Sequence, residues 1–222
     1  MCGRFSQIKS QQDLEKYFGR QMKARFRGPN YNVAPTQYVP VVTAEGMEEM
    51  RWGLVPQWAK SLNVGYSMIN AVGETLTEKV TYKRPLKYQR CVVPASGFYE
   101  WMGTPAGKIP YYFHLRGREI FGFAGLWVSR KDSEGVVMKS FTIITSKPNS
   151  VVEPIHNRMP VILRQEDEAV WLDPEVTDEV DLLSLCQPYD AADMTKYPVG
   201  KAVGNVRNNG PDLIVPQEQV LG

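Results

Sequence analysis

The stretch at residues 90–101 reads RCVVPASGFYEW. Its β-branched and aromatic side chains predict a strand over residues 90–101. Further strands are expected at 39–43, 48–54, 111–116, 119–128, 140–145 and 159–163, which share this composition and are separated by Pro and Gly. Because these strands do not alternate regularly with helices, the pattern predicts an α+β fold rather than a doubly wound parallel sheet. We expect a β-rich domain with a strongly curved or barrel-like mixed sheet, flanked by short helices.

Three segments outside these strands have the features of helices. Ser10 is placed to cap a helix that ends at Gly19, with Asp13 three residues after the cap. Residues 165–172 and 175–186 have acidic first turns and apolar residues at a spacing near that of a helix.

The composition allows one compact domain and gives it little net charge. The chain has 222 residues, of which 43% are hydrophobic, so residues 1–222 are expected to form a single domain with a substantial core. Lysine and arginine number 26, aspartate and glutamate 24, and the net charge is +2. Any nucleic-acid-binding surface must therefore be local. No apolar run has the length of a membrane span and no signal peptide is evident, so we expect a cytoplasmic protein with no membrane association.

Cysteine and histidine are too few and too scattered to predict a metal site. The three cysteines, Cys2, Cys91 and Cys186, form no C-x-x-C motif, which argues against zinc binding and against a disulfide framework. Of the two histidines, His114 lies in an alternating strand pattern and is expected to be a surface or strand-packing residue, which leaves His156. We expect no metal and no cofactor.

The second residue of the chain has chemistry that an internal cysteine lacks. If Met1 is removed, Cys2 carries a free α-amine beside its thiol, which makes it a 1,2-aminothiol. Reference pKa values of about 8 for the amine and about 8.5 for the thiol leave both groups partly unprotonated and nucleophilic in neutral water. The alternative is a cysteine that only happens to lie at a frayed terminus.

Three other segments place reactive or hydrogen-bonding side chains in irregular backbone. Asn70 precedes small residues in SMINAVGET, where it can orient a substrate atom or form a turn. Glu100 lies between two aromatic residues, where desolvation can raise its pKa, although a salt-bridged carboxylate is the commoner case on a strand. His156 lies between two prolines in the loop EPIHNRMP. Because no G-x-S-x-G motif predicts a hydroxyl nucleophile, these three side chains are the candidate supporting groups for Cys2.

A series of sequence blocks appears in order from residue 2 to about residue 210. The blocks are MCGRF, YNVAPTQ, RWGLVPQW, INA followed by Glu74-Thr75, SGFYEW, IHNRMP and AVGNVRNNG. In this order they resemble the SOS response-associated peptidase family, the abasic-site-processing proteins. The resemblance implies a β-rich fold with helices around a curved sheet. It also implies a protein that recognises abasic sites in single-stranded DNA, joins itself to them through the N-terminal cysteine, and removes its own Met1 by autoproteolysis.

The implied reaction agrees with the chemistry of an aminothiol. An abasic deoxyribose opens to an aldehyde, an amine condenses with that aldehyde to a Schiff base, and a neighbouring thiol can then close a thiazolidine ring. The resemblance implies that Asn70 positions the sugar or the Cys2 amine and that Glu100 shuttles protons in ring opening and crosslink reversal. His156 would assist proton transfer near the sugar and phosphate. Strand cleavage by a lyase reaction is left open as a competing outcome.

The candidate DNA-binding residues are cations, amides and tryptophans from several segments. The basic run TEKVTYKRPLKYQR at residues 77–90 can be a solvated face, but beside the implied site we interpret it as part of a phosphate track with stacking platforms. The candidates are Arg4, Asn32, Trp52, Trp58, Lys83, Arg84, Trp101, Lys147, Arg158 and Asn205. The expected partner is single-stranded DNA containing abasic sites, bound by a monomer that is nucleoid-associated when engaged and has little sequence preference.

Position 72 departs from the family pattern, which usually has arginine two residues after the motif asparagine. Here Asn70 and Ala71 are followed by Val72, which cannot donate to phosphate. We expect this change to weaken affinity for single-stranded DNA while sparing the covalent chemistry.

Two other functions remain open from the sequence. One is an N-terminal-nucleophile amidohydrolase such as a glutaminase domain, in which Cys2 attacks an amide carbonyl with its own amine as base. No glutamine-binding pattern is apparent, however, and a basic region with tryptophans would have no purpose in such an enzyme. The other is a noncatalytic single-strand-binding module, in which Cys2 would be dispensable.

Overall fold

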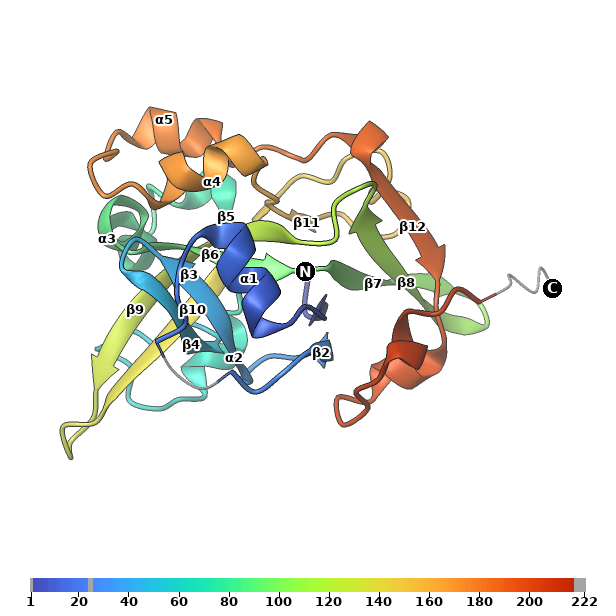
Figure 1. The fold of residues 1–222 in the computed structure, drawn as a ribbon, viewed down its shortest axis with the longest axis horizontal. Coiled ribbons are helices and arrows are strands. Elements are labelled where there is room, and N and C mark those ends of the chain that lie inside the picture. Colours follow the sequence, from blue (N-terminus) through green and yellow to red (C-terminus); the bar gives the residue numbers. More distant parts are fainter. Residues whose placement is uncertain (1, 24–25, 218–222) are drawn as a thin grey trace.

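The computed structural model describes residues 2–23 and 26–217 (Figure 1). The strands are β1 (Phe5–Gln7), β2 (Asn30–Val33), β3 (Tyr38–Thr43), β4 (Gly46–Trp52), β5 (Asn70–Val72), β6 (Arg90–Ala95), β7 (Gly97–Thr104), β8 (Gly107–Leu115), β9 (Phe121–Lys131), β10 (Val137–Ser146), β11 (Met159–Pro160) and β12 (Met194–Pro198). The α-helices are α1 (Gln11–Phe18), α2 (Val64–Ser67), α3 (Val80–Tyr88), α4 (Gln165–Leu172) and α5 (Glu179–Ser184). Short 3-10 helices lie at Gly73–Thr75, Ala191–Asp193, Lys201–Gly204 and Pro211–Ile214.

Five strands close into a barrel in the order β4, β3, β6, β9 and β10. The barrel closes because β10 pairs with β9 on one side and with β4 on the other. The β10–β4 pairing is parallel and the other pairings in the ring are antiparallel, so the sheet is mixed. The short β5 continues the parallel pairing along β10. The predicted α+β class, with a barrel-like mixed sheet, is confirmed.

A second sheet has the order β12, β8, β7, β1 and β2, and all its pairings are antiparallel. The stretch at 90–101 joins the two sheets, because its first half is β6 of the barrel and its second half begins β7 of the second sheet. The prediction of a single strand over 90–101 is therefore wrong. The chain changes sheets at Ser96-Gly97, where a Cβ on Gly97 would collide with the Tyr112 ring, so only glycine allows β7 to approach β8 this closely.

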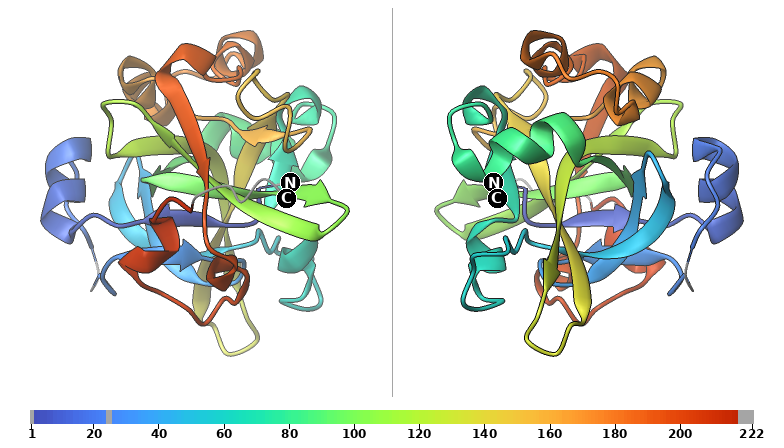
Figure 2. Two further views of the ribbon diagram at one scale, coloured as in Figure 1. Left: turned by 90° about the vertical axis from the view of Figure 1, so that its right-hand side faces the viewer. Right: turned by 90° about the vertical axis from the view of Figure 1, so that its left-hand side faces the viewer.

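The described residues form three hydrophobic clusters, and the two larger ones follow from the alternation of side chains along the barrel strands. One core joins barrel residues such as Val93 and Phe123 to Phe98 and Phe113 of the second sheet. The other packs the opposite face of the barrel against α1, α3, α4 and α5, with Trp171 at its centre. Figures 1 and 2 show α3, α4 and α5 gathered at one end of the molecule, with β8 and β12 at the other. The second sheet and the helices therefore cover different sides of the barrel.

Two of the three predicted helices begin and end close to where their local sequence signals placed them. Ser10 and Asp13 form the predicted capping box of α1, and Gly19 ends the helix in the left-handed conformation. The predicted helix at 165–172 has the bounds of α4, whereas the one predicted at 175–186 shortens to α5 because Asp178 caps it. Helix α3 was not expected inside the basic run.

Candidate functional site

Cys2 lies where the start of the chain enters the second sheet. It precedes β1, which pairs with β7 through Phe5 and Phe98, and the Tyr99 amide donates to the Arg4 carbonyl oxygen over 3.0 Å. The side chain of Cys2 is fully buried, and its Sγ lies 3.7 Å from the Arg4 carbonyl oxygen. The Cys2 thiol is thus held in the interior beside the strand that carries Glu100.

Asn70 reaches Cys2 from the barrel. It is the first residue of β5, and its register opposite Ile143 of β10 fixes its position. Its Nδ2 donates to the Cys2 carbonyl oxygen over 2.8 Å. Its Oδ1 is buried and has no hydrogen-bond partner among the described residues. Asn70 therefore positions the backbone of Cys2 and keeps one acceptor unused.

Glu100 and His156 complete the group. Glu100 is 4% exposed, and its Oε1 is buried without a hydrogen-bond partner in the part of the chain that the structure describes. Its Oε2 lies 3.9 Å from Nε2 of His156. The other ring nitrogen of His156 lies 3.1 Å from the amide nitrogen of Arg158 and 3.0 Å from its carbonyl oxygen, so either tautomer can be held.

Burial dominates the electrostatics of these groups. It raises the pKa of Glu100 from 4.5 to about 7. Burial first, and the charge of Glu100 second, raise the pKa of the Cys2 thiol, so this thiol is protonated at neutral pH. Burial also lowers the pKa of His156 from 6.5. Although the 3.9 Å separation lies within ion-pair range, both shifts disfavour the charged forms, so near pH 7 Glu100 is divided between its protonated and ionised forms and His156 is mainly neutral.

Arg158 is engaged by the protein itself. Its guanidinium forms a bidentate ion pair with Glu74, with N–O distances of 2.8 and 2.7 Å. It also donates to the carbonyl oxygen and the hydroxyl of Thr145. The sequence motifs included Glu74 but did not identify it as the partner of Arg158, and the available signal was a carboxylate four residues after the motif asparagine.

The structure corrects the prediction that Asn32 contacts DNA. Asn32 is 1% exposed, and both polar atoms of its side chain are bonded within the protein. Its Oδ1 accepts from Arg4 over 2.6 Å, and its Nδ2 donates to the carbonyl oxygens of Val203, Asn205 and Asn208. These bonds hold the segment around the 3-10 helix Lys201–Gly204 against the second sheet.

Arg4 is part of the same structural cluster. Besides Asn32, it donates to the carbonyl oxygens of Val203 and Gly204, and its guanidinium lies 5.9 Å from the centre of the Trp101 ring. Burial lowers the pKa of Arg4. Most of its donors are used inside the protein, so its predicted role at a phosphate remains a proposal.

The three candidate tryptophans have different surroundings. Trp52 is fully buried, donates from Nε1 to the Ile69 carbonyl oxygen and packs against Phe5 and Phe141. Its prediction as a stacking platform for DNA is wrong, because barrel closure places it in the core. Trp101 is half-buried and Trp58 is 66% exposed. Of the three, Trp58 offers the largest free ring.

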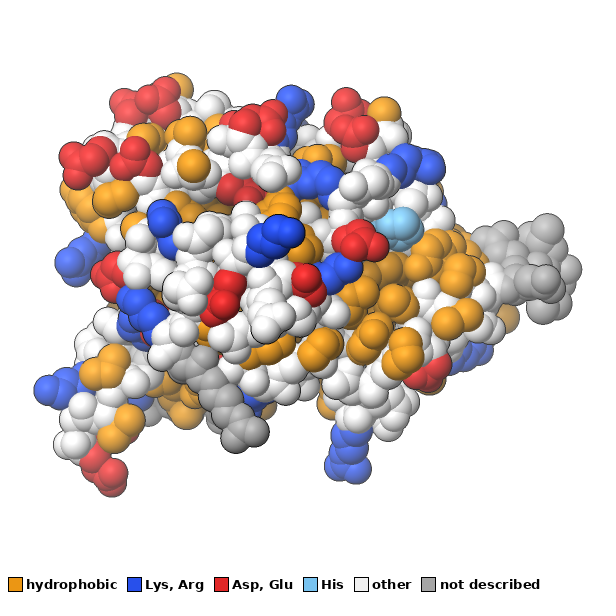
Figure 3. All heavy atoms as spheres, viewed as in Figure 1, with side chains coloured by type: hydrophobic (Ala, Val, Ile, Leu, Met, Phe, Trp, Pro, Cys, Tyr) orange, Lys and Arg blue, Asp and Glu red, His pale blue; other side chains and the backbone are white. Residues whose placement is uncertain are grey.

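The remaining candidate cations and amide lie on the surface. Lys83 and Arg84 are exposed on α3, which lies at the left in Figure 1, whereas β7 with Glu100 lies at the right. Lys147 is exposed after β10, and Asn205 is exposed with its Oδ1 accepting from the Arg207 amide. Figure 3 shows lysine and arginine mixed with acidic side chains on this face, without a continuous basic track.

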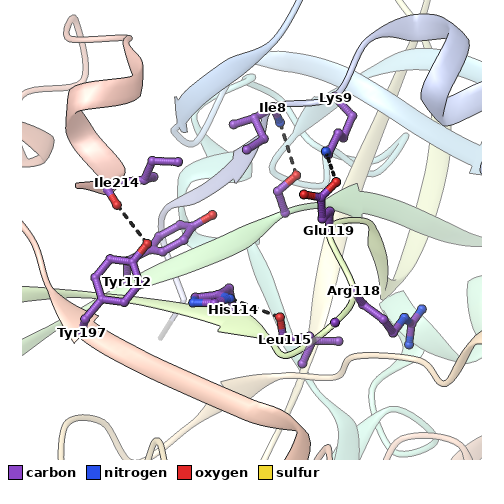
Figure 4. A pocket seen from close by; sticks show the side chains of 11 residues that line it. Ile8, Lys9, Tyr112, His114, Leu115, Arg118, Glu119, Tyr197 and Ile214 are labelled. Carbon is purple, nitrogen blue, oxygen red and sulfur yellow. Dashed lines mark hydrogen bonds and ion pairs between the residues drawn. The ribbon is translucent and has the colours of Figure 1, made fainter. Parts of the chain in front are cut away.

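A separate cavity of about 560 Å³ lies away from these residues (Figure 4). Its lining includes His114, which packs against Tyr112 and Tyr197 with ring centroids 5.9 and 5.5 Å away. His114 is thus the strand-packing histidine that the sequence predicted. Neither Cys2 nor Glu100 lines this cavity.

Within residues 2–23 and 26–217, no helix is long and apolar enough to cross a membrane. In the same part of the chain, no three His, Cys, Asp or Glu side chains are grouped as metal ligands.

The sequence matches the family described as SOS response associated peptidase (SRAP) over residues 1–206. A solved structure of a protein from Bacteroides thetaiotaomicron has the same fold, with a TM-score of 0.91 at 28% identity, and the match covers 98% of this chain and 100% of that one. The chain therefore belongs to the SOS response associated peptidase family.

Its relatives carry a common name. The chain is 44% identical over 221 residues to the abasic site processing protein YoqW of Bacillus subtilis (strain 168), covering 96% of this chain and 99% of YoqW. It is 34% identical over 222 residues to the abasic site processing protein HMCES of Xenopus tropicalis, covering 84% of this chain and 65% of HMCES.

Proposed function

We propose that this protein processes abasic sites in single-stranded DNA by attaching itself to them through Cys2 after Met1 has been removed. The observation that carries the proposal is the placement of Cys2 beside Glu100, whose pKa of about 7 suits it to take and return a proton near neutral pH. The names of the relatives support the processing of abasic sites, and with it a role in the response to DNA damage.

The proposed reaction has two steps. The Cys2 amine adds to the aldehyde carbon of the ring-opened sugar and water leaves, which forms a Schiff base. The Cys2 sulfur then bonds to the same carbon, its proton passes to the nitrogen through a neighbouring group, and a thiazolidine ring results. The second step is intramolecular, so the thiol acts at a high effective concentration.

Each neighbour of Cys2 has a task in this scheme. Glu100 protonates the departing hydroxyl and accepts the thiol proton, which the buried and protonated thiol of Cys2 requires. Asn70 orients Cys2 through its carbonyl oxygen and offers its unused Oδ1 to the amine or the sugar. His156 exchanges protons with Glu100 across the 3.9 Å between them.

DNA binding is proposed to rest on the exposed candidates. Trp58 and Trp101 would stack on bases, and Lys83, Arg84, Lys147 and Asn205 would contact the backbone. Strand cleavage from the Schiff base and autoproteolytic removal of Met1 belong to the same proposal, as do a cytoplasmic location and action as a monomer.

The test mixes the mature protein with single-stranded oligonucleotides that carry one abasic site or none. We expect a heat-stable shifted band on a denaturing gel with the abasic strand alone. Release of ammonia from glutamine without such a band would instead identify the amidohydrolase.

A further inference from the structure

We propose that Glu74 is a positioning residue that holds His156 at its working distance from Glu100, acting through Arg158. This inference rests on the proposed function. It concerns how the acid-base pair is kept in place rather than which groups react.

The ion pair joins the two segments that supply the supporting groups. Glu74 lies in the 3-10 helix Gly73–Thr75, directly after the strand β5 that begins with Asn70. Arg158 comes two residues after His156. The bidentate contact at 2.8 and 2.7 Å therefore ties the end of β5 to the turn that presents the imidazole.

The guanidinium is held on a second side by β10. Arg158 donates to the Thr145 carbonyl oxygen over 2.5 Å and to its hydroxyl over 3.3 Å. Thr145 is itself paired with Val72 of β5 and with Pro160 of β11. Glu74 thus adds a second restraint on Arg158, and removing its carboxylate leaves the guanidinium bonded to Thr145 of β10 but no longer tied to the segment after β5.

The backbone of Arg158 transmits this restraint to the imidazole. His156 Nδ1 lies 3.1 Å from the Arg158 amide nitrogen and 3.0 Å from its carbonyl oxygen, so the ring orientation follows the backbone at residue 158. The other nitrogen lies 3.9 Å from Glu100, which is longer than a hydrogen bond. A shift of a fraction of an ångström decides whether the two groups come into hydrogen-bond contact.

The ion pair of Glu74 with Arg158 is geometrically more restrained than an isolated surface ion pair. Its geometry is bidentate, and the Arg158 side chain is 18% exposed against 44% for Glu74. The hydrogen bonds from Arg158 lower the pKa of Glu74, so the carboxylate is ionised at neutral pH. A matched comparison exists in the ion pair of Lys87 with Glu179, at 3.0 Å and with exposures of 33% and 30%, between α3 and α5.

The test compares Glu74→Ala with the control Glu179→Ala. We expect Glu74→Ala to slow adduct formation about tenfold or more, as small misplacements of reacting groups do, while noncovalent affinity for single-stranded DNA is not weakened. Glu179→Ala should leave the rate of adduct formation unchanged. Glu74→Gln keeps one oxygen acceptor for Arg158 and should therefore lose less of the rate than Glu74→Ala.

The two histidines give a readout that does not depend on activity. In nitrogen-edited NMR spectra, the His156 ring signals should shift in Glu74→Ala, and the His114 signals should not, which also shows that the fold is intact. Adduct formation at the parent rate with unmoved His156 signals would overturn the inference, and so would a loss of affinity as large as the loss of rate. If the parent forms no Cys2 adduct but the His156 signals still move in Glu74→Ala, the proposed function fails and the positioning role stands.

Discussion

Two groups of buried polar side chains lie near the start of the chain, and they differ in how their hydrogen-bonding atoms are used. Around Cys2, Asn70 Oδ1 and Glu100 Oε1 are buried without partners among the described residues. In the second group, Asn32 bonds to Arg4 and to three backbone carbonyl oxygens. Because an unpaired buried polar atom costs stability, the difference is consistent with our proposal that the first group serves chemistry, whereas the second stabilises the fold.

The largest effect is expected at Cys2. Cys2→Ala, or an N-terminal tag that converts the amine to an amide, should abolish the durable adduct, because one lacks the thiol and the other lacks the free amine. Cys2→Ser keeps the amine and should give only a labile Schiff base, measured by borohydride trapping. The control Cys186→Ala should crosslink like the parent protein. A durable adduct with Cys2→Ala would show that the polar side chains around Cys2 are not a reactive group.

Glu100→Gln should slow the chemistry and increase stability. Gln keeps the shape but cannot exchange a proton, so we expect adduct formation to fall by about a hundredfold in single-turnover assays. Folding raises the pKa of Glu100 from 4.5 to about 7, so its protonated form stabilises the fold below pH 4.5 and this contribution is lost as the pH rises through 7. Urea unfolding should therefore show the variant gaining stability over the parent from pH 5 to pH 8. Equal stability at all pH values would contradict the assignment of a buried, titrating carboxyl group.

Asn32→Ala should lower the stability of the fold and leave the rate of adduct formation nearly unchanged, the opposite of Glu100→Gln. Loss of the buried amide leaves several carbonyl oxygens and Arg4 without their partner, so we expect the free energy of unfolding to fall by about 1–3 kcal/mol. The rate of adduct formation by folded protein should stay close to that of the parent. A large loss of rate with unchanged stability would place Asn32 in the reactive group instead.

The sequence anticipated elements that depend on local signals. The capping box of α1 needs only Ser10 and Asp13 side by side on one turn, and curvature of the sheet followed from strands that do not alternate with helices. The motifs also predicted Cys2, Asn70, Glu100 and His156 as site residues. In the structure Asn70 bonds to Cys2, Glu100 lies 3.9 Å from His156, and the carbonyl oxygen of Arg4, which follows Cys2 closely along the chain, accepts from the Tyr99 amide beside Glu100.

Features that depend on distant pairings could not be predicted. The change of sheet at Ser96-Gly97 depends on pairings with distant strands, because β6 pairs with β9 whereas β7 pairs with β1 and β8. Trp52 is buried by Phe141 of β10, where the barrel closes, and by Phe5 of the second sheet. Helix α3 was hidden by Pro85 and by the surrounding cations, although Leu86 is buried on its inner face. In each case the local structure is set by tertiary contacts that the local sequence does not contain.

Trp58→Ala removes the exposed ring and should moderately weaken noncovalent binding of single-stranded DNA. If one base stacks on this side chain, noncovalent affinity for single-stranded DNA should fall by about 1 kcal/mol, or about fivefold. Tyr66→Ala is the control, since Tyr66 is 61% exposed against 66% for Trp58 and has no proposed contact with DNA. Equal losses in a fluorescence anisotropy titration would show that ring exposure alone does not define the DNA path.

Val72→Arg is expected to have the smallest effect. An added guanidinium at the end of β5 should tighten binding of single-stranded DNA about twofold and steepen its dependence on salt, because one more phosphate is neutralised. The rate of the covalent step should not change, since Val72 is not a reacting group. Unchanged affinity and salt dependence would remove the inference that this position matters.

The central claim is that the reactive group converges on the Cys2 aminothiol, and mass spectrometry of the adduct tests it most directly. Mature protein is reacted with a single-stranded oligonucleotide bearing one abasic site, the adduct is digested, and the crosslinked peptide is sequenced. We expect the sugar remnant on the peptide that begins Cys2-Gly3, as a thiazolidine that has lost one water relative to its components. A remnant on any other residue, or no crosslinked peptide, would contradict the account.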